Sequence, residues 1–269
     1  MKYPHIGDSV VIKRIEEDDR RGVFHYEGLY TGYGVTAGNA LRRVLLSSIP
    51  GAAITKMKIQ NVDHEFSTLP GMVEDIVEFS LNLKKVRFHF FADEAQALTL
   101  HIKGEREVTA GDIKETAFVK VVNPELHIAT LTKKNAELEV ELTIEKGIGY
   151  VPAESRRLER LQIGTIILDA IFSPLTRVEF AVENMRVGDR TDYNRLKIEI
   201  ETDGSITPSE ALVRGATILR DHFERFTGLT VRNLATAGTS EQETKEKEKE
   251  SASGEKQEKK KKITKKIKK

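Results

Sequence analysis

Alternation of apolar and polar side chains with a period of two is the feature that most restricts how this chain folds. In the clearest run, residues 137–144, every second side chain is Leu, Val or Ile, and the others are Glu or Thr. A strand with this pattern buries one face and leaves the other in water, as in antiparallel sheets. The same alternation predicts further strands, in chain order: residues 9–15, 53–59, 98–102, 178–182 and 196–200.

Three segments carry the start and stop signals of helices. The first covers residues 37–48 and ends before a Pro-Gly pair, and the second covers residues 72–83 and follows such a pair. The third starts at Pro208, with Thr207 as the N-cap and Glu210 completing a capping box, and runs to a glycine about 20 residues on. Strands with one wet face and a few covering helices predict an α+β protein.

The third helix carries an apolar seam whose members are spaced 4, 3, 4 and 3 residues apart. A period of 3.5 is typical of a helix that packs against another helix along its length. Ala211, Gly215 and Ile218 form a second apolar edge, and Gly215 indicates a close helix approach, because a mid-helix Gly costs about 1 kcal/mol relative to Ala. Two edges favour two partners, one of them a symmetry-related copy; packing on the chain's own sheet is the alternative. The seam consists of Leu212, Ala216, Leu219, Phe223 and Phe226.

The charge of the chain is divided between an acidic body and a basic end. Residues 241–269 hold 12 Lys and 7 Glu, a net charge of +5, so residues 1–240 carry a net charge of −4. Residues 236–269 contain almost nothing apolar and bury too little apolar surface to offset their ordering entropy, which predicts a disordered tail over residues 231–269. The lysines predict weak, salt-sensitive attraction to nucleic-acid phosphates, with a solubilising role as the alternative.

No residue pattern predicts catalysis or a metal site. The seven His are scattered, and Thr68 stands where a zinc helix beginning at His64 would need its second ligand. Nucleophile-elbow and P-loop motifs are missing, and the glycines at 32, 34 and 38 have the wrong spacing for a dinucleotide loop, so they indicate a turn and a helix start. The absence of Cys excludes disulfides and thiol chemistry. We predict no catalytic residue, metal ligand or cofactor, and no membrane partner, since no apolar run approaches ~18–20 residues.

The helix at residues 37–48 offers an interaction surface instead. On a helical wheel, Arg43 points away from the apolar face, and Arg42 and Leu46 lie on its flank. An exposed Leu beside two Arg has the composition of an interface hot spot; two solvated arginines are the alternative. The apolar face consists of Leu41, Val44, Leu45 and Ser48.

Eight blocks, in the same order, resemble the bacterial RNA polymerase alpha subunit family. The longest, residues 32–48, reads GYGVTAGNALRRVLLSS. Together the blocks extend over about residues 5–228. The others are His64–Thr68, Glu74–Ile76, Leu81–Lys84, Gly149–Ala153, Asp169–Pro174, Arg186–Asp192 and Glu201–Pro208.

The resemblance implies a discontinuous architecture. Residues 1–50 and 176–230 would form a dimerisation domain, a sheet with two partner-packing helices, and residues 51–175 a mainly β domain inserted between them. In the family, the two helices of the first domain form the interface between two alpha subunits. The implied dimer interface consists of Leu41, Val44, Leu45, Leu212, Ala216, Leu219, Phe223 and Phe226.

The resemblance also implies a function. In the family, alpha is the homodimeric scaffold of DNA-directed RNA polymerase, a nucleotidyltransferase, and recruits the beta and then the beta-prime subunit. Arg43 matches an Arg that matters for beta binding. Phosphodiester chemistry and its magnesium belong to the large subunits, and the implied location is the bacterial cytoplasm, at the nucleoid. The implied large-subunit contacts are Arg42, Arg43, Leu46, Arg186, Arg190 and Asp192.

The chain departs from the family pattern at several positions. Ala37 replaces the usual Leu, Ile148 the usual Arg and Asp189 the usual Gln; we expect local repacking at the first two, since the glycines and proline around them are kept. The family also carries a DNA-binding domain after a flexible linker. Residues 230–269 are too short and too polar for such a domain, so we expect its function to be missing or replaced by non-specific DNA contact through the lysine tail.

Overall fold

The computed structural model describes residues 10–156, 162 and 164–229 of the chain. The chain separates into two units, one ending at His222 and the other beginning at Phe223, inside helix α3 (Pro208–Thr227). Among its described residues, the first unit contains two large hydrophobic cores and a small cluster of Ala53, Ala170 and Phe172. Within the described ranges, no helix has the length and apolar character needed to cross a membrane.

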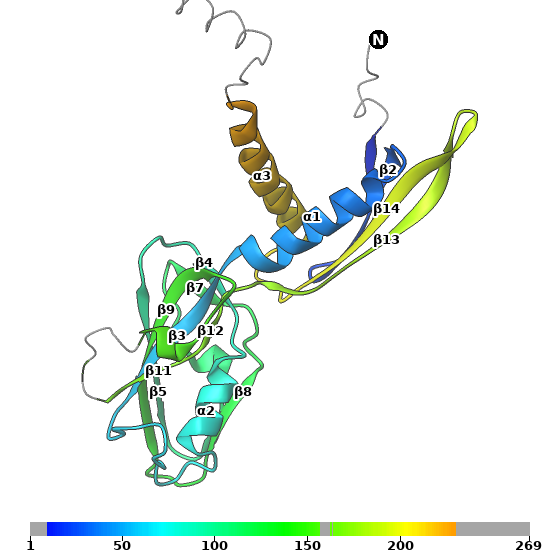
Figure 1. The fold of residues 1–269 in the computed structure, drawn as a ribbon. Helices are drawn as coiled ribbons and strands as arrows, with labels where there is room; N and C mark the ends of the chain where they lie inside the picture. Colours follow the sequence, from blue (N-terminus) through cyan, green and yellow to red (C-terminus); the bar gives the residue numbers. More distant parts are fainter. Residues whose placement is uncertain (1–9, 157–161, 163, 230–269) are drawn as a thin grey trace, which may run out of the picture. The chain divides into compact units, whose positions relative to one another are not determined.

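The first core lies between a four-stranded antiparallel sheet and helix α1 (Tyr33–Ser48), which runs along two of its strands (Figure 1). Apolar side chains of the sheet such as Phe24, Ile198 and Ile200 are buried in this core together with Leu45 of α1. The strands, in spatial order, are β1 (Val11–Glu17), β2 (Arg21–Leu29), β14 (Arg190–Thr202) and β13 (Leu175–Val187).

The opposite face of this sheet carries ion pairs, as the period-two alternation predicts. The Nζ atom of Lys13 lies 2.7 Å from Glu27 Oε2, and Arg195 Nε lies 3.0 Å from Oε1 of the same residue. Arg21 Nη2 lies 2.7 Å from Glu199 Oε1. Ion pairs at a protein surface contribute only about 0–1 kcal/mol each, so their main effect is to make this face of the sheet polar. The predicted α+β class with one wet sheet face is confirmed.

Glycines bring α1 close to the sheet and start it earlier than predicted. Gly32 has a φ of 85° and is the N-cap, so the chain turns directly into a helix at Tyr33 and not at residue 37. Gly38 faces β13: a Cβ added there would lie 2.6 Å from Cδ2 of Phe180. The turn and helix start predicted at these glycines are therefore confirmed, and Gly38 adds a close helix–sheet contact.

The second core fills the space between another antiparallel sheet and helix α2 (Ile76–Leu83). The four strands, in spatial order, are β11 (Thr165–Ile167), β3 (Pro50–Ile59), β9 (Glu137–Ile148) and β5 (Gln96–Lys103). Three two-stranded ribbons accompany them: β4 (Phe88–Phe90) with β7 (Val119–Val121), β6 (Arg106–Thr109) with β8 (His127–Leu131), and β10 (Tyr150–Val151) with β12 (Ala170–Ile171).

Helix α2 begins at Ile76, later than the predicted residue 72. Asp75 is its N-cap, and its Oδ1 accepts a hydrogen bond from Glu78 N at 2.6 Å. Just before the cap, Val73 N donates to Thr130 O at 3.0 Å. These residues pair with β8, and that pairing holds them outside the helix although their spacing resembles one.

Helix α3 has the predicted bounds, and two residues cap its first turn. Thr207 Oγ1 accepts from Glu210 N at 3.3 Å, as the N-cap prediction requires. The Glu210 carboxylate pairs with Arg214, in place of the reciprocal bond of a capping box. The other cap comes from β1, where Glu17 accepts hydrogen bonds from Ser209 N at 2.8 Å and from Ser209 Oγ at 2.6 Å.

Candidate functional site

The inner edge of α3, formed by Ala211, Gly215 and Ile218, packs on the first core. Ala211 and Gly215 are buried, and a Cβ added to Gly215 would lie 2.9 Å from Cδ2 of Leu45 in α1. The predicted close helix approach at Gly215 is therefore confirmed, and the neighbouring helix is α1 of the same chain.

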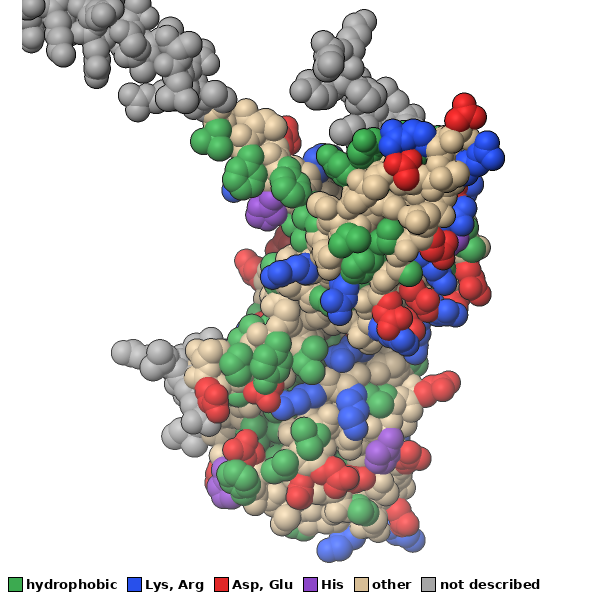
Figure 2. All heavy atoms as spheres, turned by 45° about the vertical axis from the view of Figure 1, so that its right-hand side comes forward, with side chains coloured by type: hydrophobic (Ala, Val, Ile, Leu, Met, Phe, Trp, Pro, Cys, Tyr) green, Lys and Arg blue, Asp and Glu red, His purple; other side chains and the backbone are tan. Residues whose placement is uncertain are grey.

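The seam edge of α3 remains exposed in the single chain. The side chains of Phe223 and Phe226 are 60% and 66% exposed, and their ring centroids lie 6.5 Å apart. Ala216 is exposed, and Leu212 and Leu219 are half-buried. Figure 2 shows hydrophobic side chains gathered over the end of this helix. Large exposed apolar groups that cluster on one helix edge indicate a protein contact.

Leu45 requires a correction to the predicted interface between copies. It has no exposed surface and lies in the first core beside Gly215. Leu45 therefore supports α1 from inside and offers nothing to a second chain. Leu41 and Val44, on the same helix, are half-buried and keep part of their surface in solvent.

The two arginines of α1 differ in what holds them. Arg42 Nε donates to Val178 O of β13 at 3.1 Å, so this side chain covers the edge of the sheet. Arg43 is exposed, and among the described residues no hydrogen bond or ion pair engages its guanidinium. Leu46 beside it is 36% exposed. Arg43 is therefore the cation of this helix that a partner could bind without first breaking a contact.

The other predicted cations lie at the tip of the β13–β14 hairpin. The turn passes through Gly188, whose φ is 62°. Arg190 donates to both carboxylate oxygens of Asp192, at 3.0 and 2.7 Å. Its guanidinium carbon also lies 5.3 Å from the ring centroids of both Tyr30 and Tyr193. The Arg190–Asp192 ion pair at the hairpin tip therefore lies beside two aromatic rings.

This ion pair is satisfied within the chain. Hydrogen bonds from Arg190 and then from Thr31 lower the pKa of Asp192 to about 2, and Asp192 in turn raises the pKa of Arg190. Thr31 Oγ1 lies 2.6 Å from the Asp192 carbonyl oxygen and 2.9 Å from its carboxylate, which ties the segment before α1 to the hairpin. Arg186 Nε donates to Gly188 O at 2.7 Å. A partner would meet an aromatic surface here on which the charges of Arg190 and Asp192 are already paired.

A separate charged cluster surrounds His127 on β8. Its Nδ1 lies 2.9 Å from Glu107 Oε1, and its Nε2 lies 3.0 Å from Oε1 of the buried Glu74. The hydrogen bond with Glu74 raises the pKa of His127. Burial alone would raise the pKa of Glu74, but hydrogen bonds from Thr130 and His127 outweigh it and the pKa is lowered. The cluster therefore favours a charged imidazole between two carboxylates.

Comparison with known proteins identifies the family. Residues 57–173 match the family model described as RNA polymerase Rpb3/RpoA insert domain. The DNA-directed RNA polymerase subunit alpha of Symbiobacterium thermophilum is 50% identical over 230 residues, which cover 86% of this chain and 71% of the relative. Those of Limosilactobacillus reuteri and Bacillus velezensis are 48% and 46% identical, over 81% and 80% of this chain and 70% and 68% of theirs. The chain belongs to the DNA-directed RNA polymerase alpha subunit family.

The positions where this alpha subunit departs from the family pattern lie mostly at its surface. Ile148, at the end of β9, is 56% exposed, and the side chain of Asp189 projects into solvent at the hairpin tip. Ala37 is half-buried and packs against the first core. Within the described part of the chain, no group of three or more His, Cys, Asp or Glu side chains is placed to hold a metal ion.

Sequence reasoning missed the residues that support these surfaces in the alpha subunit. Tyr30, Thr31 and Tyr193 order the hairpin tip, and Asn194 Oδ1 accepts from Gly32 N at 2.8 Å, which holds the start of α1. The bonding partners of Thr31 and Gly32 lie more than 150 positions away in the sequence. Only the pairing of β2 with β14 brings them together.

Proposed function

We propose that this alpha subunit is the homodimeric scaffold on which the beta and beta-prime subunits of RNA polymerase assemble. The observation that carries the proposal is the unequal burial of the two edges of α3. The inner edge is satisfied by the chain's own core, and Phe223 and Phe226 of the seam remain exposed. An identical second copy presents the same patch, so the two seams can cover each other across a two-fold axis.

The size of the seam supports a contact that uses both helices. Full burial of a Phe side chain contributes about 1.5–3 kcal/mol, so the four partly exposed Phe of a symmetric dimer would contribute on the order of 5 kcal/mol. Association itself costs roughly 4–15 kcal/mol. The phenylalanines alone therefore do not hold a stable dimer. We infer that the half-buried residues contribute the rest: Leu212 and Leu219 of α3, and Leu41 and Val44 of α1.

The two large hydrophobic cores support the division of the chain into a dimerisation domain and an inserted domain. The first core, which includes α1, β13, β14 and the start of α3, would form the dimerisation domain from residues 1–50 and 176–230. The second core draws all of its buried residues from positions 54–168 and would be the inserted domain of residues 51–175. Large-subunit binding would then use Arg43 and Leu46 on α1 and the tip of the β13–β14 hairpin, with Arg42 holding the sheet edge beside them.

The experiment that tests this proposal is co-purification of the large subunits with tagged variants of the alpha chain from cells. Arg43→Ala should leave the alpha dimer intact, because within the described residues no hydrogen bond or ion pair engages the Arg43 side chain, and should reduce the amount of beta recovered. Lys134→Ala is the matched control: Lys134 is exposed and lies in the loop before β9, so this variant should recover beta at the wild-type level. Undiminished beta with Arg43→Ala, or loss of the dimer, would show that this surface is wrongly assigned.

A further inference from the structure

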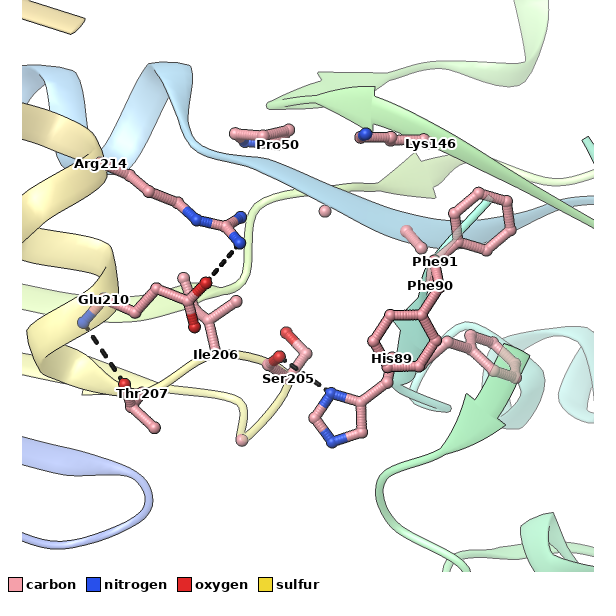
Figure 3. A pocket seen from close by; sticks show the side chains of 14 residues that line it. Pro50, His89, Phe90, Phe91, Lys146, Ser205, Ile206, Thr207, Glu210 and Arg214 are labelled. Carbon is pink, nitrogen blue, oxygen red and sulfur yellow. Dashed lines mark hydrogen bonds and ion pairs between the residues drawn. The ribbon is translucent and has the colours of Figure 1, made fainter. Parts of the chain in front are cut away.

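A cleft of about 440 Å³ lies where the loop after β14 and the first turns of α3 face β3, β4 and β9 (Figure 3). Its volume falls within the range of about 300–1,000 Å³ that ligand sites occupy. Apolar groups, among them Pro50, Phe90 and Ile206, form part of its wall. Two cations reach it from opposite sides, Arg214 from α3 and Lys146 from β9.

The two cations are only lightly engaged by the chain itself. Arg214 Nη2 lies 2.5 Å from Glu210 Oε1, and within the described residues this is its one ion pair. A guanidinium has five N–H donors, so most of its donors remain available. Lys146 Nζ lies 3.5 Å from the fully exposed Asp93, a pair of the kind that contributes little. With Glu210 as the one carboxylate in the lining, the cleft carries an excess of positive charge.

The aromatic rings of Phe91 and His89 border the same cleft. Phe91 is 67% exposed, and its ring stacks on that of His89 with centroids 6.4 Å apart. His89 is fixed in turn by Ser205 O, 3.0 Å from its Nδ1. Phe91 N donates to Phe118 O at 2.9 Å, and Phe118 is also exposed. The exposed ring of Phe91 can therefore cover an apolar side chain of a ligand next to the two cations, Arg214 and Lys146.

We infer that this cleft binds a short acidic segment of a partner polypeptide, with a carboxylate between Arg214 and Lys146 and a neighbouring aromatic or aliphatic side chain against Phe91 and Ile206. A single peptide carboxylate can share the donors of Arg214 with Glu210, whereas the several negative charges of a polyphosphate would be repelled more strongly by that glutamate. Charge complementarity thus selects an acidic peptide. None of the residues assigned to dimerisation or to large-subunit binding lines the cleft, so the inference goes beyond the proposed function.

Fluorescence anisotropy with the full-length chain tests this site. The probe is a fluorescein-labelled peptide, Gly-Glu-Phe-Asp-Leu-Glu-Gly, and its control carries Lys in place of the three acidic residues. The acidic peptide should bind saturably and the basic one should not. The double variant Lys146→Glu/Arg214→Glu should bind the acidic peptide at least tenfold more weakly, and Lys134→Glu, the matched charge reversal away from the cleft, should bind it as the wild type does.

A second variant separates binding from folding. Phe91→Ala removes an exposed ring, so the melting temperature should stay unchanged while the affinity for the acidic peptide falls. Equal binding of the peptide by the wild type and the double variant, or no binding by either, would overturn the inference. ATP or inorganic phosphate binding that the double variant abolishes, without peptide binding, would also overturn it by assigning the cleft to phosphates. The dimer mass should be the same in all these variants, which keeps the result independent of the scaffold proposal.

Discussion

The Asp192 carboxylate shows how a single residue joins distant parts of this subunit. It accepts two hydrogen bonds from Arg190 within the hairpin and lies 2.9 Å from Thr31 Oγ1, 161 positions earlier in the chain. Because its pKa is lowered from 3.8 to about 2, the carboxylate stays charged at all physiological pH values. The start of α1 and the hairpin tip are therefore held together under the conditions in which the subunit assembles.

His127 makes the stability of the second core depend on pH. Its folded-state pKa is raised above the ordinary 6.5 by Glu74 and Glu107, so the charged imidazole stabilises the fold fully below that value. This stabilisation is lost as the pH rises through the raised pKa. His127→Gln should therefore lower the free energy of unfolding more at about pH 6 than at about pH 9. Because the side chain is 40% exposed, the difference should be within about 1 kcal/mol.

Urea denaturation at the two pH values measures this difference. His222→Gln is the control, because His222 is exposed and no ion pair engages it within the described residues. Its effect should be small and equal at both pH values. A cost of His127→Gln that is the same at both pH values, or larger at the higher one, would contradict the charge assignment.

Among the elements, α3 depends on contacts from β1 and from α1. Its first turn is capped by Glu17 of β1, and its inner edge at Gly215 contacts Leu45 of α1. Arg42 of α1 in turn bonds to the backbone of β13. The sheet edges, α1 and the first half of α3 are thus linked, so Leu212, Ala216 and Leu219 of the seam lie on a segment that its neighbours hold in place.

Gly38→Ala tests the close packing of α1 on the sheet. A Cβ at this position would lie 2.6 Å from the Phe180 ring, so the helix or the ring must shift. We expect a loss of about 1–3 kcal/mol in the free energy of unfolding, as for other overpacked sites. Asn39→Ala, an exposed change one residue on, should stay within about 0.5 kcal/mol of the wild type. Denaturant melts that show no loss for Gly38→Ala would mean that the contact is looser than described.

Local signals in the sequence predicted most of these elements, because each signal acts over a few residues. The alternation over residues 137–144 and the Thr207 N-cap both indicated elements that the structure contains. The starts of α1 and α2 were wrong, since Gly32 initiates a helix without a loop and Val73 pairs with β8. The burial of Leu45 was missed for a related reason: helical spacing identifies an apolar face but not which neighbour covers it.

At the scale of the whole molecule, the positive charge gathered in residues 241–269 predicts a salt-dependent contact with DNA. Deleting Lys259–Lys269 removes eight Lys from a segment that lies outside the described residues. Retention of the full-length chain on a DNA column should fall at low salt and change little at high salt, because screening weakens phosphate attraction. Deletion of Ser251–Glu255, a stretch without Lys, is the control. Equal retention of the Lys deletion and the wild type at every salt concentration would favour a purely solubilising role.

The mass of the purified full-length chain in solution tests the scaffold account most directly. Sedimentation equilibrium should give about twice 30.3 kDa. Phe223→Asp should reduce the mass to that of one chain while the circular dichroism spectrum stays unchanged, because burying an unpaired carboxylate in the seam is costly. Val213→Asp, on the same helix but outside the seam, should remain a dimer although Val213 is as exposed as Phe223. A wild-type mass of one chain at micromolar concentration, or a Phe223→Asp dimer, would contradict the account.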